Sequence, residues 1–199
     1  PAHLKVPSRF VLTDKAEGRR TDEFDCPIEA KARLVLLGNL EKLLKSSSTA
    51  LRTDAPTVSA LGTNLLLQRA ASWGTDVQQG DVTQAFMSGD ELERKVYVVP
   101  PREGLEGVPP GSLLLLKRAA YGLADAPRKW WKRLCRTLEA AGWRESKLVE
   151  ALYYLWDKSG RCCGMLGAHV DDVLVTGSGS TFEKSLQYLR SNLNWGSWK

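Results

Sequence analysis

The stretch GMLGAHVDDVLVTG at residues 164–177 is an apolar run interrupted at its centre by two acidic residues, Asp171 and Asp172. Burying an ionised carboxylate is very costly unless a partner charge or a metal ion compensates it. The stretch predicts a β-hairpin in which VDD forms the tip and VLVTG forms the returning strand. Two interpretations of the acidic pair stay open at this point: ordinary turn chemistry at a hairpin tip, or a pair of metal ligands.

Composition narrows the class of protein. The chain has 199 residues, of which 43% are hydrophobic and 26% are charged, so it can bury a sizeable core and does not resemble a disordered protein. A net charge of +5 permits a polyanionic partner without requiring one. No apolar stretch reaches the ~20 residues needed to cross a bilayer, and no signal peptide is visible. Because the chain begins with Pro1 and not with Met, we expect it to be a fragment of a longer protein.

The cysteines and histidines form no metal or disulfide pattern. No CxxC pair occurs among the four cysteines, and two histidines are too few for a histidine-rich metal site. We therefore expect free thiols in a reducing compartment. The residues are Cys26, Cys135, Cys162, Cys163, His3 and His169.

Strand-like and helix-like segments alternate along the chain without regular βαβ spacing. This order predicts an α+β fold, an antiparallel sheet with helices packed on one face. A short helix or mobile loop would fit the poorly readable residues 39–57. Strands are expected at 8–13, 31–38, 75–82, 95–101, 112–120, 151–156 and 161–169, and helices at 58–73, 126–141 and 181–193.

The helix expected at 126–141 is amphipathic. Pro127 suits its first turn, and Gly142 follows its end. At about 100° per residue, the Trp and Leu side chains fall on one arc and the basic side chains on the opposite arc. The basic arc is either a solvated face or a surface for phosphates. It holds Arg128, Lys129, Lys132, Arg133 and Arg136.

A metal site needs carboxylates that converge from separate segments of the chain. Magnesium prefers hard oxygen ligands, and two ions about 3.5–4 Å apart can clamp the attacking and leaving oxygens of a phosphoryl transfer. Asp171 and Asp172 supply one segment, and Asp81, at the end of TDVQQGD, is the candidate for the other. The alternative for Asp81 is a helix N-cap, with Gln84 completing a capping box.

Four stretches, in order, resemble the reverse transcriptase of copia-type retrotransposons. This resemblance extends from about residue 8 to residue 193. It implies a single domain over 1–199 with reverse-transcriptase-like fingers (about 1–75 and part of 96–125) and palm (about 76–95 and 126–199), and with no thumb or ribonuclease H. The stretches are KARLV at 31–35, DVTQAFMSGD at 81–90 followed by VYVVPP at 96–101, KRAAYGLADAPRKWW at 117–131, and HVDDVLVTG at 169–177.

The resemblance implies a catalytic role for three aspartates. Asp81, Asp171 and Asp172 match the palm carboxylates that hold two Mg²⁺ ions, with Mn²⁺ as the alternative, during transfer of a dNTP to a primer 3′ end. Phe86 matches the aromatic that stacks under the incoming sugar and excludes a ribose 2′-hydroxyl. Its alternative role is that of a core aromatic.

Other matched residues would contact the nucleotide or the nucleic acid. Lys31 and Arg33 would grip the triphosphate, unless they only protect an exposed edge strand by their charge. Tyr121 and Gly122 would border the nucleotide and template. The residues matched to nucleic-acid contacts are His169, at the primer terminus, and Arg128, Lys132 and Arg136, on the duplex phosphates.

Three departures from the family pattern bear on activity. His169 stands where a tyrosine is usual, Ala124 and Asp125 replace a basic residue and a glutamine, and residues 39–57 match the fingers poorly. Asp125 would weaken the local attraction for nucleic acid. A catalytically silent or domesticated fragment that at most binds nucleic acid is therefore the alternative function, and a signalling nucleotide cyclase is a third, weaker reading.

The expected partners and location follow from the resemblance. They are an RNA or DNA template-primer, a dNTP and the remainder of the Pol polyprotein (thumb, ribonuclease H and integrase), with no membrane. The expected location is intracellular, either in a cytoplasmic virus-like particle or in the nucleus, and not secreted.

Overall fold

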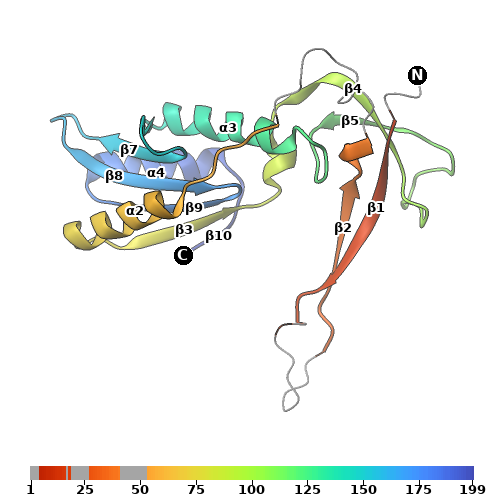
Figure 1. Ribbon diagram of the computed structural model, residues 1–199, viewed down its shortest axis with the longest axis horizontal. Helices are drawn as coiled ribbons and strands as arrows, with labels where there is room; N and C mark the ends of the chain where they lie inside the picture. The colour runs from red at the N-terminus through yellow and green to blue at the C-terminus, as the bar shows by residue number, and fades with distance from the viewer. Residues whose placement is uncertain (1–4, 17, 19–26, 41–52) are drawn as a thin grey trace. The chain divides into compact units, whose positions relative to one another are not determined.

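A computed structural model of the chain describes residues 5–16, 18, 27–40 and 53–199 (Figure 1). The chain divides into two compact units, one formed by Pro1–Leu51 with Glu91–Ala126, the other by Arg52–Asp90 with Pro127–Lys199. The helix or loop expected within 39–57 falls mostly on residues 41–52, which lie outside the described residues, as do His3 and Cys26. Cys135, Cys162 and Cys163 are free thiols, as predicted.

The first unit contains a four-stranded sheet with the order β2-β1-β4-β5 (Figure 1). β1 pairs antiparallel with β2, and β4 pairs antiparallel with β5, but β1 and β4 run parallel through Lys5↔Tyr97, Val6↔Val98 and Pro7↔Val99. The prediction of a purely antiparallel sheet is wrong for this unit. A parallel pair needs a long crossover connection, and the chain between β1 and β4 supplies one. The strands are β1 Lys5–Asp14, β2 Ala30–Leu36, β4 Glu91–Val99 and β5 Leu114–Arg118, with a 3₁₀ turn, η3, at Gly38–Leu40.

The second unit contains a six-stranded sheet with the order β10-β3-β9-β8-β7-β6, antiparallel throughout as predicted. Two of its strands were not expected from the sequence, because β6 has two residues and β10 has four, too few for a readable alternation. The strands are β3 Val77–Val82, β6 Arg144–Glu145, β7 Leu152–Trp156, β8 Cys162–His169, β9 Asp172–Gly177 and β10 Trp195–Trp198.

Three helices of the second unit cover both faces of this sheet (Figure 1). Trp130 of α3 (Ala126–Ala140) and Phe182 of α4 (Ser180–Asn192) share a core with Tyr153, whereas Leu66 of α2 (Ala60–Trp73) packs with Leu152. Successive residues of a strand point to opposite faces. The prediction that all helices lie on one face is therefore wrong, because β7, β8 and β9 carry apolar side chains on both faces.

The helix boundaries follow their local sequence signals. Ser59 caps α2 by accepting a hydrogen bond from the Gly62 N–H, and Gly74 ends the helix at φ 63°, as its position predicts. α4 buries Phe182, Leu186 and Leu189 on one side, as its periodicity predicts. None of the described helices is both long and apolar enough to cross a membrane.

Candidate active site

The β8–β9 hairpin turns through two residues, Val170 and Asp171, directly after the last strand pair, His169↔Asp172. Val170 has φ 57°, so the first central residue alone has a positive φ, the pattern of a type II′ turn. This conformation is a genuine outlier for a β-branched side chain. The indole N–H of Trp130 donates to the Val170 carbonyl (2.6 Å), and the Val82 N–H donates to the Asp171 carbonyl (2.9 Å). The strained tip is thus fixed to both α3 and β3.

Asp81 and Asp172 face each other across the β3–β9 pair. Because the adjacent Val82–Asp171 position carries the ladder hydrogen bond, Asp81↔Asp172 is a non-hydrogen-bonded pair, with Cα atoms about 4.5 Å apart and both side chains on one face. Both residues are half-buried, and Gln79 Nε2 lies 3.4 Å from Asp172 Oδ1. Like charges directly opposite destabilise a sheet, so a bound cation would remove an unfavourable interaction here.

Asp81 belongs to a strand and does not cap a helix. The short 3₁₀ helix η4 (Ala85–Ser88) that follows has Gln84 at its N-cap position, with no side-chain capping bond. The capping-box alternative for Asp81 and Gln84 is therefore wrong. The pairing of β3 with both β9 and β10 holds Asp81 in extended backbone instead.

β10, which the sequence did not predict, borders Asp81 on the other side. Ser197 is the partner of Asp81, and the register shifts between Trp195 and Ser197 at Gly196. A Cβ on Gly196 would lie 2.2 Å from Thr83 Oγ1 and 3.1 Å from Asp81 Oδ2. Only glycine leaves room for both side chains at this bulge.

The three carboxylates are the kind of oxygen ligand that a hard divalent cation prefers. Two of them, those of Asp81 and Asp172, belong to residues that are direct partners in the β3–β9 pairing. Asp81 and Asp172 would hold the ion from adjacent strands, with Asp171 beside them on the turn. As the side chains stand, no group of three or more His, Cys, Asp and Glu residues in the described part of the chain is arranged to hold a metal ion. The structure therefore brings the backbones of the three aspartates together without gathering their carboxylates into a complete cage.

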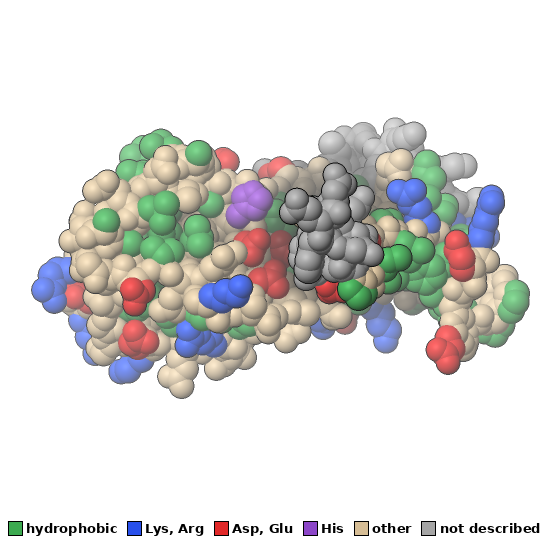
Figure 2. Space-filling model, turned by 90° about the horizontal axis from the view of Figure 1, so that it is seen from below, with side chains coloured by type: hydrophobic (Ala, Val, Ile, Leu, Met, Phe, Trp, Pro, Cys, Tyr) green, Lys and Arg blue, Asp and Glu red, His purple; other side chains and the backbone are tan. Residues whose placement is uncertain are grey.

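Two further expected residues lie in the same unit. His169 is exposed at the end of β8, and Figure 2 shows this histidine, the single one among the described residues, beside a group of acidic side chains. Phe86 is half-buried in η4 and packs against the core that α3 and α4 share. One side of the Phe86 ring therefore already packs against the protein core.

The basic face of α3 is partly neutralised. Arg128 lies over the Trp131 ring (4.3 Å to the centroid) and pairs with Asp54 (3.1 Å), and Arg136 pairs with Asp90. Lys132 is exposed and has no ion pair to any residue that the structure describes. Of the three cations expected on duplex phosphates, Lys132 alone is available without displacing a carboxylate.

The sequence also matches a known protein family. The family model described as reverse transcriptase (RNA-dependent DNA polymerase) matches residues 2–193. The chain belongs to this reverse transcriptase family. The copia-type resemblance is thereby confirmed.

The relatives of this reverse transcriptase family member are much longer proteins, and the chain matches only a part of each. The chain is 29% identical over 182 residues to the retrovirus-related Pol polyprotein from transposon RE1 of Arabidopsis thaliana, covering 91% of the chain and 12% of the relative. It is also 29% identical to the Pol polyproteins from transposon RE2 of Arabidopsis thaliana (154 residues, 77% of the chain, 10% of the relative) and from transposon TNT 1-94 of Nicotiana tabacum (155 residues, 77% and 11%). The chain thus spans about a tenth of the length of these relatives. No solved structure matches it.

Four of the nucleotide-contact residues expected from the reverse transcriptase resemblance lie in the first unit, whereas Phe86 and the three aspartates lie in the second. Lys31 is half-buried and Arg33 exposed on β2, an edge strand of its sheet. Tyr121 and Gly122 accept backbone hydrogen bonds from Leu36 (2.7 Å) and Gly38 (3.0 Å).

The backbone packing of the first unit explains why position 122 is a glycine. It has φ 88°, and a Cβ there would lie 1.9 Å from the Leu36 carbonyl oxygen. The close backbone approach expected at Gly122 is therefore made to Leu36 and Gly38 of the same unit.

Asp125 is a buried partner of Arg94 within the first unit. Its side chain is 2% exposed, and both carboxylate oxygens accept hydrogen bonds from the guanidinium. The expectation that Asp125 weakens the local attraction for nucleic acid stays a prediction, and the structure adds that the charge of Asp125 is compensated inside the fold. No local sequence pattern predicts this pair, whose members are 31 residues apart.

Proposed function

We propose that the chain is the fingers-and-palm part of an RNA-directed DNA polymerase within a retrotransposon Pol polyprotein. The single observation that carries the proposal is the register of Asp81 with Asp172 at the strained β8–β9 turn, in a chain of the reverse transcriptase family. The first unit would correspond to the fingers and the second to the palm. This division assigns α2 to the palm, although the sequence placed residues up to about 75 in the fingers.

Asp81, Asp171 and Asp172 would hold the cations in this polymerase. Two Mg²⁺ ions, or Mn²⁺ in their place, would activate the primer 3′-hydroxyl and neutralise the departing pyrophosphate. The chain's own part is positioning, since the hydrogen bonds that fix Val170 and Asp171 hold the tip before substrate arrives. A rotamer change of the carboxylates, Asp171 above all, would complete the set.

The remaining residues would orient the substrates. Phe86 would stack under the sugar and exclude a 2′-hydroxyl, and His169 would contact the primer terminus. Lys132 would meet a duplex phosphate, joined by Arg128 and Arg136 once their carboxylate partners are displaced. In the first unit, Lys31 and Arg33 would bind the triphosphate, and Tyr121 and Gly122 would border the nucleotide and template.

The proposed partners are an RNA or DNA template-primer, a dNTP and the thumb, ribonuclease H and integrase parts of a Pol polyprotein. The names of the relatives as Pol polyproteins support this setting. The corresponding location is a cytoplasmic particle or the nucleus.

Primer extension on an RNA template with Mg²⁺ tests the proposal. The Asp81→Asn and Asp171→Asn variants should lose at least about a hundredfold in rate, because each removes a charge that acts on the transition state. Asp76→Asn is the matched control, since Asp76 is an exposed aspartate just before β3, and it should keep wild-type activity. Extension that is unchanged by Asp171→Asn would refute the assignment.

A catalytically silent relative that binds nucleic acid is the second candidate. The observation that favours it is the lack of a complete metal-holding group among the described residues. Salt-dependent template-primer binding, with no incorporation in either Mg²⁺ or Mn²⁺, would select this function over the polymerase.

A further inference from the structure

A basic groove lies at the end of the second unit's sheet opposite the Val170–Asp171 turn. Two cavities of about 880 and 760 Å³ share Trp156, Asp157, Arg161, Ser180 and Thr181 in their walls. We call this continuous surface the distal groove. The seven residue steps along β8 from Cys162 to His169 correspond to roughly 23 Å, so the groove is separate from the aspartates.

The β7–β8 loop presents a preorganised arginine to the distal groove. Asp157 Oδ1 accepts hydrogen bonds from the N–H of Ser159 (2.9 Å), the Ser159 hydroxyl (2.6 Å) and the N–H of Arg161 (3.0 Å). Its Oδ2 lies 3.4 Å from Arg161 Nε. These contacts lower the pKa of Asp157 to about 2, the Ser159 hydroxyl contributing most. Asp157, the single carboxylate among the described residues that line the groove, is therefore satisfied within its own loop.

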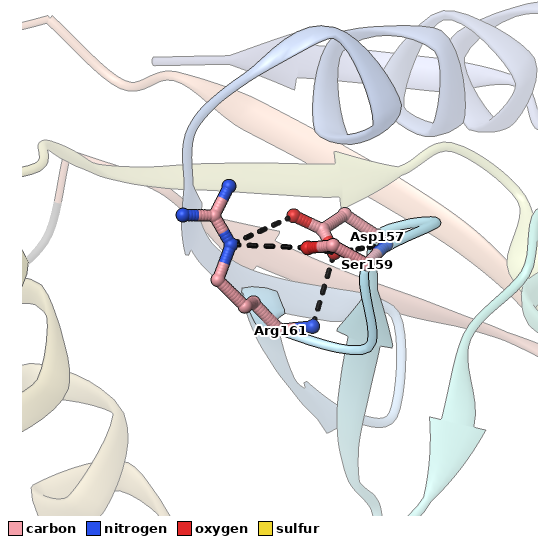
Figure 3. A network of polar contacts seen from close by, with 3 residues as sticks. All are labelled: Asp157, Ser159 and Arg161. Atoms are coloured by element: carbon pink, nitrogen blue, oxygen red, sulfur yellow. Dashed lines mark hydrogen bonds and ion pairs between the residues drawn. The ribbon is translucent and has the colours of Figure 1, made fainter.

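The guanidinium of Arg161 remains available for a ligand. Figure 3 shows its two Nη atoms turned away from Asp157, and neither bonds to any described residue. The Arg161 side chain is 82% exposed. Lys158 and Lys184 are exposed in the same walls, and Arg69 lines the larger cavity. A planar guanidinium fork held in this way matches phosphate geometry.

The start of α4 adds uncharged donors to the distal groove. Its N-cap residue, Gly179, makes no side-chain capping bond, so the first-turn N–H groups are not capped from Gly179. The helix dipole favours an anion at this end. Independently, Ser185 lines the smaller cavity, and its hydroxyl is buried (the residue is 5% exposed) with no hydrogen-bond partner among the described residues.

Exposed aromatic rings accompany these donors. Trp156 is 51% exposed and Tyr188 is 40% exposed, and both line the smaller cavity. Aromatic faces next to cations bind the bases and phosphates of single-stranded nucleic acid without sequence preference. An acidic peptide would use the cations but not the rings, so the combination favours nucleic acid.

We propose that the distal groove is a second nucleic-acid site, which binds a single strand with its phosphates on Arg161 and the start of α4 and its bases on Trp156 and Tyr188. This site does not depend on polymerase activity. A strand bound there would lie away from the primer terminus and would tether nucleic acid to the protein.

Fluorescence anisotropy with a labelled oligo-dT strand, in EDTA, tests the site on the 199-residue chain. Arg161→Glu should weaken binding at least about fivefold. It should also reduce the slope of log affinity against log salt concentration by about one, since one counterion fewer is released on binding. Lys147→Glu, an equal charge reversal at an exposed lysine outside the groove, should weaken binding less than about twofold. Equal losses in the two variants would overturn the proposal.

A second pair of variants separates stacking from charge. Trp156→Ala should weaken binding about fivefold or more, because it removes the ring on which a base would stack. Leu148→Ala removes an apolar side chain that is 95% exposed and should leave affinity unchanged. An oligoglutamate of equal charge that competes as well as the oligonucleotide would reassign the groove to acidic peptides.

Photocrosslinking of the wild-type chain to a 4-thiothymidine strand keeps the proposal testable if a variant misfolds. The expected adducts fall on peptides that contain Trp156 or Tyr188. Adducts confined to the segments around Asp81, Asp171 and Asp172 would overturn the proposal.

Discussion

Gly196 lies at the bulge of β10 beside Ser197, the partner of Asp81, so close to the carboxylate that a Cβ on the glycine would lie 3.1 Å from Asp81 Oδ2. The proposed catalytic carboxylate is thus bordered by β9, which carries Asp172, and by a bulge that has room for no side chain. The four-residue strand β10 therefore helps to set the position of Asp81.

Gly196→Ala should reduce primer extension at least about tenfold, because the new Cβ would overlap Thr83 Oγ1 at 2.2 Å and push against Asp81. The free energy of unfolding should fall by about 1–3 kcal/mol, as is usual for overpacking. The control is Gly18→Ala, where an added Cβ would meet nothing within 4 Å. Full activity in Gly196→Ala would show that the bulge does not position Asp81.

Asp125→Ala should destabilise the first unit by about 3–5 kcal/mol, because it leaves the Arg94 guanidinium without its buried partner. Urea denaturation measures this change. The matched comparison is Asp90→Ala, which breaks the pair with Arg136, whose side chain is 60% exposed, and should cost under about 1 kcal/mol. Equal destabilisation in the two variants would contradict the structural role of Asp125.

Val170→Gly should leave the free energy of unfolding unchanged or raise it by up to about 1 kcal/mol, because glycine adopts φ 57° without strain. The same change at Val77, a partly exposed strand residue without a positive φ, should cost about 1 kcal/mol. Thermal unfolding of the two variants distinguishes them. A larger loss at Val170 than at Val77 would show that the turn is not strained.

The β7–β8 loop should make stability depend on acid pH. The pKa of Asp157 is lowered from 3.8 to about 2 by hydrogen bonds from Ser159 and Arg161, so the unfolded chain binds more protons between these values. The contribution of Asp157 is thus complete above about pH 4 and is lost as the pH falls toward 2. Denaturation curves of wild type and Asp157→Asn should converge over this window. A constant difference from pH 5 to pH 2 would contradict the lowered pKa.

The sequence predicted those parts of the fold whose signal is local. The hairpin around Asp171 was readable because an acidic pair interrupts an apolar run, and α3 was readable from its two opposed arcs. β10 was not readable, since WGSW has no alternation and pairs with a strand more than 100 residues earlier. The Arg94–Asp125 pair and the packing of α2 on the opposite sheet face likewise depend on tertiary contacts that no local pattern encodes.

Thermal unfolding with and without Mg²⁺ tests for a metal site at Asp81 and Asp172, because it measures what this pair does without requiring catalysis. In EDTA, Asp172→Asn should be as stable as wild type or up to about 1 kcal/mol more stable, since it removes a like-charge cross-strand pair. Mg²⁺ should then raise the unfolding temperature of wild type and of Asp76→Asn, but not that of Asp172→Asn. A Mg²⁺ response that is the same in all three proteins, or absent from all three, would contradict a metal site at these aspartates.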